Sequence, residues 1–192
     1  PGGWGEVAPF WDYGSEASAP WLASGLSQAL GNSVLPRYRE TIPVNVTVPE
    51  VGAQEAAETV RACGARTAKV KVSGSPERRS ADLERLEAVR SALGRSGKVR
   101  IDVNGAWDLE TARENLPRMD RAAGGLEYAE QPCATVYDLA DLRRAVDVPI
   151  AADESIRLSS NPLEVVHRRA ADVAILKIAP LGGVHRALDM AE

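Results

Sequence analysis

The sequence predicts an α/β fold: a partial (β/α)₈ barrel of the TIM type, with about six of the expected eight strands. From Thr41 onward, apolar runs rich in β-branched residues alternate with helical runs rich in Ala, Leu, Glu and Arg. Strands that alternate with helices form parallel sheets. The strands recur about every 26 residues, so eight strand–helix units would need about 210 residues, the size of a barrel core. A doubly wound open sheet is the alternative, but no glycine-rich phosphate loop follows the first strand.

Six short apolar segments bounded by turn residues are predicted to be the strands. In a sheet of six strands, the first and the last would expose unpaired and largely apolar edges. We therefore expect this length of chain alone to associate or to be poorly soluble, and to be inactive. We also expect two further strand–helix units beyond it. The predicted strands are 44–48, 68–72, 99–103, 126–129, 149–152 and 173–178.

The helical runs between these strands include 54–63, 77–93 and 136–146. Gly64 and Gly94 follow the first two runs, as glycine commonly follows the last turn of a helix. Thr135 precedes the third run and is expected to cap it. Pro117 lies within the helical run after Trp107. Because proline removes a backbone donor, we expect that helix to be kinked or split.

The first 40 residues differ in composition from the rest and are predicted to form a separate domain, with 41–192 as the barrel domain. They hold three of the four Trp residues and the only Phe. Segment 4–10 is predicted to be a short strand. Segment 15–30 is predicted to be an amphipathic helix that ends at Gly31.

The composition is that of a globular protein with charges of both signs. The chain has 23 basic and 27 acidic residues, a net charge of −4, which argues against a nucleic-acid surface and a polybasic membrane patch. No stretch approaches the roughly 20 apolar residues of a membrane-spanning helix. The first five residues lack the basic start and the apolar core of a signal peptide. Cys63 and Cys133 cannot form a disulfide framework or a structural zinc site, so a reducing, cytoplasmic location is expected.

Charged residues lie near the carboxyl ends of five consecutive predicted strands, although buried parallel strands are usually apolar throughout. In a barrel, these ends form the mouth where active sites are built. Three carboxylates at one mouth would repel one another unless a cation lay between them, and oxygen ligands favour Mg²⁺ before Mn²⁺ or Ca²⁺. The charged residues are Lys69 and Lys71, Asp102, Glu130, Asp153 and Lys177.

A metal flanked by lysines is suited to removing a proton from the carbon next to a carboxylate. The metal neutralises the enediolate as it forms, and a neutral lysine takes the proton. A second lysine nearby and burial would both lower the pKa of the first. Each residue alone also has a structural explanation. A Lys-x-Lys strand is more often a solvated edge, and an acid at a strand end usually caps the next helix. Glu127 and Glu154 are expected to be structural acids that face helices or form salt bridges. The recurrence in consecutive strands favours catalysis.

Five short motifs resemble, in order, the signature of the enolase superfamily, muconate-lactonising subgroup. They are Lys69-Val70-Lys71, Asp102-Val103-Asn104, Glu130-Gln131-Pro132, Asp153-Glu154-Ser155 and Leu176-Lys177-Ile178. Further motifs resemble the o-succinylbenzoate synthase family in its actinobacterial form. They lie at 4–10, 43–49, 67–72, 130–133 and 180–183. The resemblance covers essentially the whole chain, as an internal piece of a longer protein.

The resemblance implies an Mg²⁺-dependent lyase, with Mn²⁺ as the alternative metal. By this likeness Asp102, Glu130 and Asp153 hold the metal. Lys71 is the base that takes the α-proton and then the acid that helps hydroxide leave, and Lys177 stabilises the enediolate from across the ring. The implied reaction is syn dehydration of 2-succinyl-6-hydroxy-2,4-cyclohexadiene-1-carboxylate to o-succinylbenzoate in menaquinone biosynthesis. The partner is then a small carboxylate substrate.

The same resemblance implies that residues 1–40 are the C-terminal part of an α+β capping domain and 41–192 the first six strand–helix units of the barrel. An N-acylamino acid racemase, a dipeptide epimerase or a muconate cycloisomerase would use the same lysines and metal, and an inactive truncated remnant is the alternative of another class. The oligomeric state stays open. The residues implied to support the reaction are Lys69, Asn104 and Ser155, with Gly182 and Gly183 approaching the succinyl arm.

Overall fold

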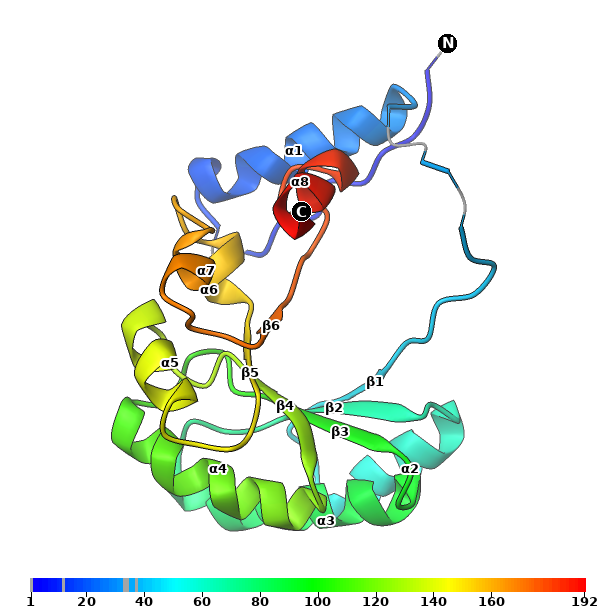
Figure 1. Cartoon of the computed structure of the whole chain (residues 1–192). Helices are drawn as coiled ribbons and strands as arrows, with labels where there is room; N and C mark the ends of the chain where they lie inside the picture. Colours follow the sequence, from blue (N-terminus) through cyan, green and yellow to red (C-terminus); the bar gives the residue numbers. More distant parts are fainter. Residues whose placement is uncertain (1, 12, 33–34, 37) are drawn as a thin grey trace. The chain divides into compact units, whose positions relative to one another are not determined.

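A parallel sheet of six strands is the main feature of the computed structural model, which describes residues 2–11, 13–32, 35–36 and 38–192 (Figure 1). All six predicted strands are present, and they lie side by side in sequence order, each parallel to the next. A doubly wound sheet would reverse its strand order at a switch point, so the sequential order confirms the partial-barrel prediction. The strands are β1 (Val46–Val48), β2 (Thr67–Lys71), β3 (Lys98–Asp102), β4 (Leu126–Glu130), β5 (Ile150–Ala152) and β6 (Val173–Ala174).

The last strand, β6, is shorter than predicted. It is predicted to reach residue 178, but it ends at Ala174, four residues earlier. The backbone turns beyond it, because the N–H of Leu181 donates to the carbonyl of Lys177 and the N–H of Gly183 to that of Ile178. Lys177 therefore lies in the turn that follows the strand rather than in the strand itself.

Four helices follow the first four strands and cover one side of the sheet (Figure 1). Each of them packs against the next. A short 3₁₀ turn, η1 (Pro76–Arg78), leads into the second helix, so the predicted helix over 77–93 begins as a tighter turn. The four helices are α2 (Ala53–Cys63), α3 (Arg79–Leu93), α4 (Leu109–Ala123) and α5 (Val136–Arg143).

Three helix ends agree with the signals in the sequence, whereas α5 ends at Arg143, three residues before the predicted end. Gly64 and Gly94 follow α2 and α3 with φ angles of 65° and 74°, a region in which any other side chain would be strained. Thr135 caps α5, because its hydroxyl oxygen accepts a hydrogen bond from the N–H of Asp138 at 3.0 Å. The glycine and threonine predictions are therefore confirmed.

Pro117 lies inside α4, which is a single helix, so the proline does not split it. The alternative, that the proline kinks the helix, stays a prediction. Ala112, Leu116 and Met119 are all buried along one stripe of α4. Their spacing of four and three residues places them on the face that packs on the fold. Tertiary burial of this stripe outweighs the single backbone hydrogen bond that the proline removes.

Strands β2 and β3 present two different faces, because side chains alternate along a strand. One face is apolar and fully buried under the helices. The opposite face carries Lys69, Lys71 and Asp102, whose positions have the other parity. The fold thus holds a row of charged groups on the face turned away from the helices. The fully buried residues of the first face are Ala68, Val70, Val99 and Ile101.

The chain divides into two compact units. The first, called the sheet unit here, comprises Pro43–Ser155 and Glu164–Ala174, and it holds all six strands, α2 to α5 and the short α7 (Glu164–His167). The second unit comprises the chain up to Ile42 with two later segments, 156–163 and 175–192. The short α6 (Glu154–Arg157) runs from the first unit into the second. The predicted domain boundary after residue 40 stays a prediction.

The second unit contains α1 (Ser15–Ala29), which confirms the predicted N-terminal helix, and α8 (Val184–Ala191). The predicted strand at 4–10 is wrong, since no residue of this segment is in a strand. The segment follows α1 instead: a Cβ atom added to Gly5 would lie 1.8 Å from the carbonyl oxygen of Gly25 in that helix. Because Gly5 and Gly25 lack side chains, the backbone of this segment can lie close to the backbone of α1. The segment therefore packs against a helix and not against another strand.

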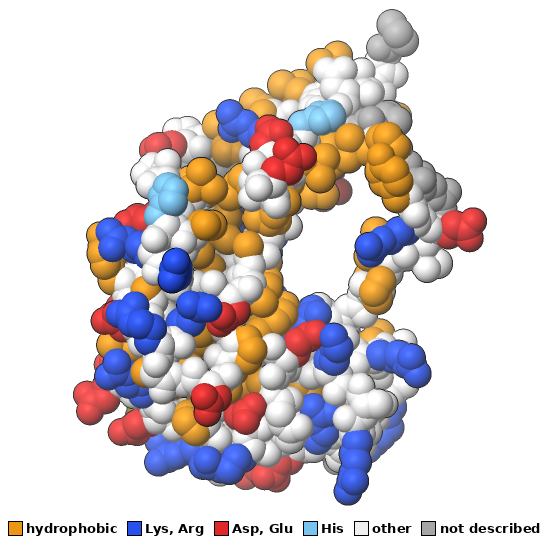
Figure 2. Space-filling view, viewed as in Figure 1, with side chains coloured by type: hydrophobic (Ala, Val, Ile, Leu, Met, Phe, Trp, Pro, Cys, Tyr) orange, Lys and Arg blue, Asp and Glu red, His pale blue; other side chains and the backbone are white. Residues whose placement is uncertain are grey.

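Charged side chains of both signs are spread over the face of the sheet unit shown in Figure 2, where Lys and Arg are interspersed with Asp and Glu. This distribution matches the mixed charge pattern of the sequence.

Among the described residues, no helix combines the length and the apolar character that crossing a membrane requires.

Candidate active site

Three of the predicted site residues are the last residues of neighbouring strands. Lys71 ends β2, Asp102 ends β3 and Glu130 ends β4. In the sheet register Lys71 stands opposite Asp102, which stands opposite Glu130. Asp153 directly follows β5. The three carboxylate residues are 1%, 1% and 0% exposed, so the parallel sheet brings buried acids and a lysine to one edge.

Two lysines of β2 form ion pairs with these carboxylates. The Lys71 Nζ lies 2.6 Å from Asp102 Oδ2. The Lys69 Nζ lies 2.9 Å from the same oxygen and 3.0 Å from Glu130 Oε1. The Lys69 ammonium therefore joins two buried carboxylates from adjacent strands, whereas Lys71 is paired with one.

These contacts shift the pKa of two groups in the direction that keeps both charged. Burial would raise the pKa of Asp102, but hydrogen bonds and charge from Lys71 and Lys69 outweigh it and hold that pKa below its usual range. Burial would likewise lower the pKa of Lys69, but Asp102 and then Glu130 raise it above its usual value. Lys69 is therefore a fixed cation in this arrangement.

Asn104, two residues beyond β3, fixes the Lys71 side chain from a second direction. Its Oδ1 accepts a hydrogen bond from Lys71 Nζ at 2.7 Å, and its Nδ2 donates to Glu154 Oε1 at 3.0 Å. Its φ of 53° lies in the left-handed region, where asparagine is better tolerated than most residues. The N–H of Asn104 donates to Asp102 Oδ1 at 3.2 Å, so the carboxylate itself stabilises this turn.

Gln131 is a site residue that the sequence analysis missed as an individual, although it stands in a quoted motif. Its fully buried amide links the end of β4 to the end of β5. The Nε2 donates to the carbonyl of Cys133 at 2.9 Å and to Ser155 Oγ at 2.7 Å. The Oε1 accepts from the N–H of Asp153 at 3.0 Å and of Ser155 at 3.1 Å. The signal in the sequence was a glutamine directly after a buried strand, a place where an amide must find partners.

The other predicted site residues lie in the second unit. Gly182 and Gly183 have φ angles of 93° and 122°, and Gly183 is the N-cap of α8, so both glycines are required by the turn itself. The carbonyl of Lys177 accepts the N–H of Leu181 in the same turn. The placement of Lys177 across a substrate ring from Lys71 stays a prediction.

The predicted metal ligands are held by protein contacts in this structure. Within the described ranges, no three His, Cys, Asp or Glu side chains form a group that could hold a metal ion. Asp102 and Glu130 are joined instead by the Lys69 ammonium. A position that stabilises an ammonium between buried carboxylates suits another cation, and carboxylate oxygens are the donors that Mg²⁺ prefers. The oxygens of Asp102 and Glu130 therefore fit a hard divalent ion by their chemistry, and such an ion would compete with Lys69. The third ligand, Asp153, stays a prediction.

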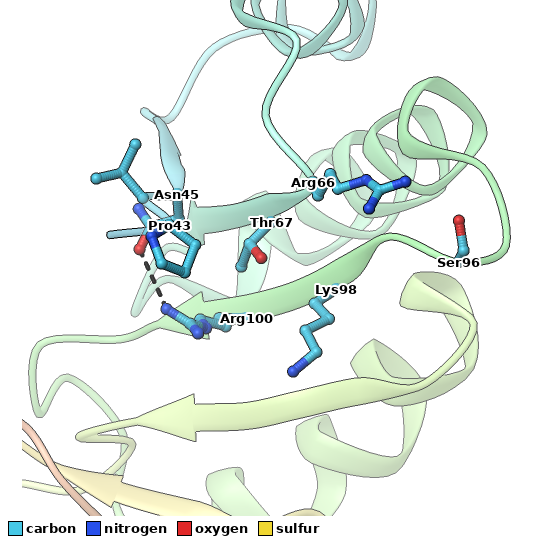
Figure 3. A pocket seen from close by; sticks show the side chains of 8 residues that line it. Pro43, Asn45, Arg66, Thr67, Ser96, Lys98 and Arg100 are labelled. Carbon is cyan, nitrogen blue, oxygen red and sulfur yellow. Dashed lines mark hydrogen bonds between the residues drawn. The ribbon is translucent and has the colours of Figure 1, made fainter. Parts of the chain in front are cut away.

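A cavity of about 700 Å³ lies at the amino ends of β2 and β3, away from these residues (Figure 3). Its lining includes Arg66, Lys98 and Arg100. The last two pair with Glu127 at 2.5 Å each, and Arg100 donates to Asn45 Oδ1 at 3.2 Å, the dashed line in Figure 3. No predicted catalytic or metal residue lines this cavity, so its size does not make it the candidate site.

Comparison with known proteins places the chain in a family. Residues 52–192 match the Enolase C-terminal domain-like family, and residues 1–29 match the Enolase N-terminal domain-like family. The chain is 53% identical over 190 residues to the o-succinylbenzoate synthase of Thermobifida fusca, a match that covers 99% of this chain and 59% of that protein. The chain thus spans less than two thirds of the length of this relative.

Two solved structures share the fold. The L-Ala-D/L-Glu epimerase from Bacillus subtilis matches with a TM-score of 0.77 and 28% identity, over 93% of this chain and 54% of that chain. The dipeptide epimerase from Cytophaga hutchinsonii, complexed with Mg and the dipeptide D-Ala-L-Val, matches with a TM-score of 0.74 and 26% identity, over 91% of this chain and 50% of that chain. These comparisons confirm the resemblance that the motifs indicate. Because the first family model matches most of the length of this chain, the chain belongs to the Enolase C-terminal domain-like family.

Proposed function

We propose that the full-length protein is an o-succinylbenzoate synthase, a lyase of menaquinone biosynthesis. It would dehydrate 2-succinyl-6-hydroxy-2,4-cyclohexadiene-1-carboxylate to o-succinylbenzoate. The observation that carries the proposal is the pairing of Lys71 with Asp102 at the carboxyl ends of parallel strands, in a chain 53% identical to the Thermobifida fusca synthase. The cytoplasmic location stays a prediction from the cysteine content.

Lys71 is the lysine of β2 best placed to move a proton. Its side chain is 31% exposed, against 17% for Lys69, so it is the more accessible to a substrate at this edge. Its Nζ is held by Asp102 Oδ2 and Asn104 Oδ1, which restrict the ammonium to one orientation. Lys69 contacts two buried carboxylates and supplies a fixed positive charge.

In the proposed reaction, unprotonated Lys71 takes the proton from the carbon that bears the substrate carboxylate. The ammonium so formed then gives a proton to the ring hydroxyl group, which leaves as water. Both events are on the same face of the ring, so one side chain can perform both. The proton balance closes, since the proton removed from carbon is replaced by one delivered to the leaving oxygen. Lys177 is proposed to stabilise the negative charge from the opposite face.

A divalent metal, Mg²⁺ in the first place, is proposed to bind at Asp102, Glu130 and Asp153. When bound, it would stabilise the negative charge that develops on the substrate carboxylate. Support comes from the three buried carboxylates at one edge of the sheet and from the Cytophaga hutchinsonii epimerase, which is complexed with Mg.

Calorimetric titration of the full-length protein with MgCl₂ alone tests the metal site. Asp102→Asn and Glu130→Gln should each weaken Mg²⁺ binding by at least about tenfold, because each removes a carboxylate charge. Glu127→Gln is the matched control, since this acid pairs with Lys98 and Arg100 near the other end of the strands. The metal assignment fails if the two site variants bind Mg²⁺ as tightly as the control.

Turnover of the cyclohexadiene substrate by the full-length protein tests the activity. Lys71→Ala should lower kcat by at least about 100-fold, the lower range for loss of a general base. Lys71→Arg should be nearly as damaging, because a guanidinium stays protonated. Lys98→Ala, which removes an exposed lysine of β3, should leave kcat within about threefold. Equal activities of Lys71→Ala and Lys98→Ala would remove Lys71 from the mechanism.

An N-acylamino acid racemase or dipeptide epimerase is the second candidate, favoured by the likeness to the Bacillus subtilis epimerase. Both activities begin with removal of the same kind of α-proton. Incubation of the full-length protein with N-acylamino acids and with dipeptides in D₂O distinguishes the candidates. Racemisation with deuterium incorporation, at a rate above that of the dehydration, would replace the synthase assignment.

A further inference from the structure

A buried ion pair lies on α3, on the helix-covered side of β2. Asp82 and Arg85 are 1% and 4% exposed, and Arg85 Nη1 lies 2.6 Å from Asp82 Oδ1. Neither residue belongs to the sequence motifs described above. The available signal was their spacing, because Asp82 and Arg85 share one stripe of the helix with the fully buried Leu86 and Val89.

Both members of the pair bind the backbone at the end of β2. Arg85 Nη1 donates to the carbonyl of Lys71 at 3.1 Å, and Arg85 Nε donates to the carbonyl of Val51, after β1, at 2.6 Å. Asp82 Oδ2 accepts the N–H of Ser73 at 3.0 Å. The pair therefore holds the residue proposed as the base and the residue two positions beyond it.

The backbone needs this support because the strand ends at Lys71. The N–H of Val72 still donates to the carbonyl of Asp102, but beyond it the sheet no longer fixes the chain. The indole N–H of Trp107 donates to the carbonyl of Ser73 at 3.2 Å and adds a third anchor. Burying an ion pair costs desolvation that an apolar pair would avoid, so stability alone does not explain the presence of this pair.

We propose that Arg85 and Asp82 are positioning residues for Lys71, an inference that rests on the proposed function. They fix the Lys71 backbone from the helix side while Asp102 and Asn104 fix its Nζ from the other side. The side chain of the base is thus held at both ends. A shift of about 1 Å in a reacting group can lower the rate about 100-fold. Removing the contacts of Arg85 or Asp82 should therefore lower kcat of the proposed reaction.

Arg90 offers a matched control on the same helix. It also binds backbone carbonyls, but at the opposite ends of the strands: it donates to Gly94 at 3.0 Å, Gly97 at 2.6 Å and Gly125 at 3.1 Å, as well as to Ala123. Arg85 and Arg90 therefore both bind backbone carbonyls but hold different loops, and Arg85 in addition pairs with Asp82.

The test compares Arg85→Lys, Asp82→Asn and Arg90→Lys in the full-length protein, each assayed well below its own unfolding temperature. Arg85→Lys and Asp82→Asn should lower kcat by about 10- to 100-fold and leave KM within about threefold. Arg90→Lys should lower the unfolding temperature without lowering kcat by more than about threefold. Asp82→Asn keeps the size of the side chain and serves as the main variant if Arg85→Lys does not fold.

Hydrogen exchange of the peptide that contains Ser73 provides a readout that is independent of turnover. The Ser73 amide should exchange at least about tenfold faster in Asp82→Asn than in Arg90→Lys. Asp82 accepts from Arg85 with one oxygen and from the Ser73 N–H with the other, whereas asparagine has a single acceptor oxygen for the two donors. The proposal is overturned if the variants at Asp82 and Arg85 change kcat no more than Arg90→Lys does, or if exchange at Ser73 is unchanged. Absence of turnover in the unsubstituted protein would instead refute the proposed function.

Discussion

Replacing Gln131 by Met should destabilise the fold far more than a change of one polar side chain usually does. Methionine has a similar length and fills the same space, so the substitution removes hydrogen bonds without opening a large cavity. In the native fold the Gln131 amide makes four hydrogen bonds, to the carbonyl of Cys133, the hydroxyl of Ser155 and the N–H groups of Asp153 and Ser155.

The magnitude follows from the groups that lose their partner. Gln131→Met removes the hydrogen-bond acceptor of two backbone N–H groups and the donor to one backbone carbonyl. Water cannot easily replace these bonds, because Gln131 and Asp153 are both 0% exposed. A buried polar group left unsatisfied costs roughly 1–3 kcal/mol. We therefore expect the free energy of unfolding to fall by about 4 kcal/mol, near the upper end for single substitutions.

Urea unfolding of the full-length protein, followed by circular dichroism, measures this change. The matched control is Gln54→Met on α2, where the exposed amide donates to Glu58 Oε1 at 2.9 Å and water can replace the bond. The control should change the free energy of unfolding by less than about 0.5 kcal/mol. A loss below about 1 kcal/mol in Gln131→Met would refute the assignment of Gln131 as the link between β4 and β5.

Two further predictions concern titratable groups of the sheet unit. Burial would raise the pKa of Asp172, but Arg143 at 2.6 Å and the N–H of Ile150 at 3.0 Å outweigh burial and lower that pKa. Asp172→Asn should therefore lower the free energy of unfolding by about 0.5–1 kcal/mol at pH 7. Urea unfolding at several pH values should show this difference vanish as the pH falls below about 4. Burial, and after it the charge of nearby acids, raises the pKa of the Cys133 thiol to about 12, whereas Cys63 is exposed. Of these two cysteines, a thiol reagent at pH 8 should therefore label Cys63 alone until the protein is unfolded. Rapid labelling of both in the folded protein would contradict this prediction.

The strand–helix order could be predicted from the sequence because each signal is local. Apolar β-branched runs, glycines after helices and Thr135 before α5 act within a few residues of themselves. Pro117 shows where a local rule is outweighed. Proline removes one backbone hydrogen bond, but burial of one stripe of α4 keeps the helix in one piece. The prediction of a strand at 4–10 is also wrong because a tertiary contact outweighs a local signal. Gly5 and Gly25 allow this segment to lie along α1.

The candidate site could be predicted in part. Lys71, Asp102 and Glu130 are found at one edge because parallel strands in sequence order bring equivalent ends together. The support of the site was not foreseen. The contacts of Gln131 and Arg85 depend on which backbone groups lack partners after the strands end, and that is decided only when the elements are packed.

The sequential strand order also bears on how the chain acquires its fold during synthesis. Among the described strands, each one from β2 to β6 pairs with the strand made just before it, so these five pairings form between neighbours in sequence. Low separation between contacting segments favours rapid folding, and domains begin to fold as the N-terminal part leaves the ribosome. The pair β1–β2 with α2 and α3 can form while β6 is still untranslated. We expect ribosome-bound chains stalled at residue 110 to protect β2 from proteolysis already, at a stage when the site still lacks Glu130 and Asp153.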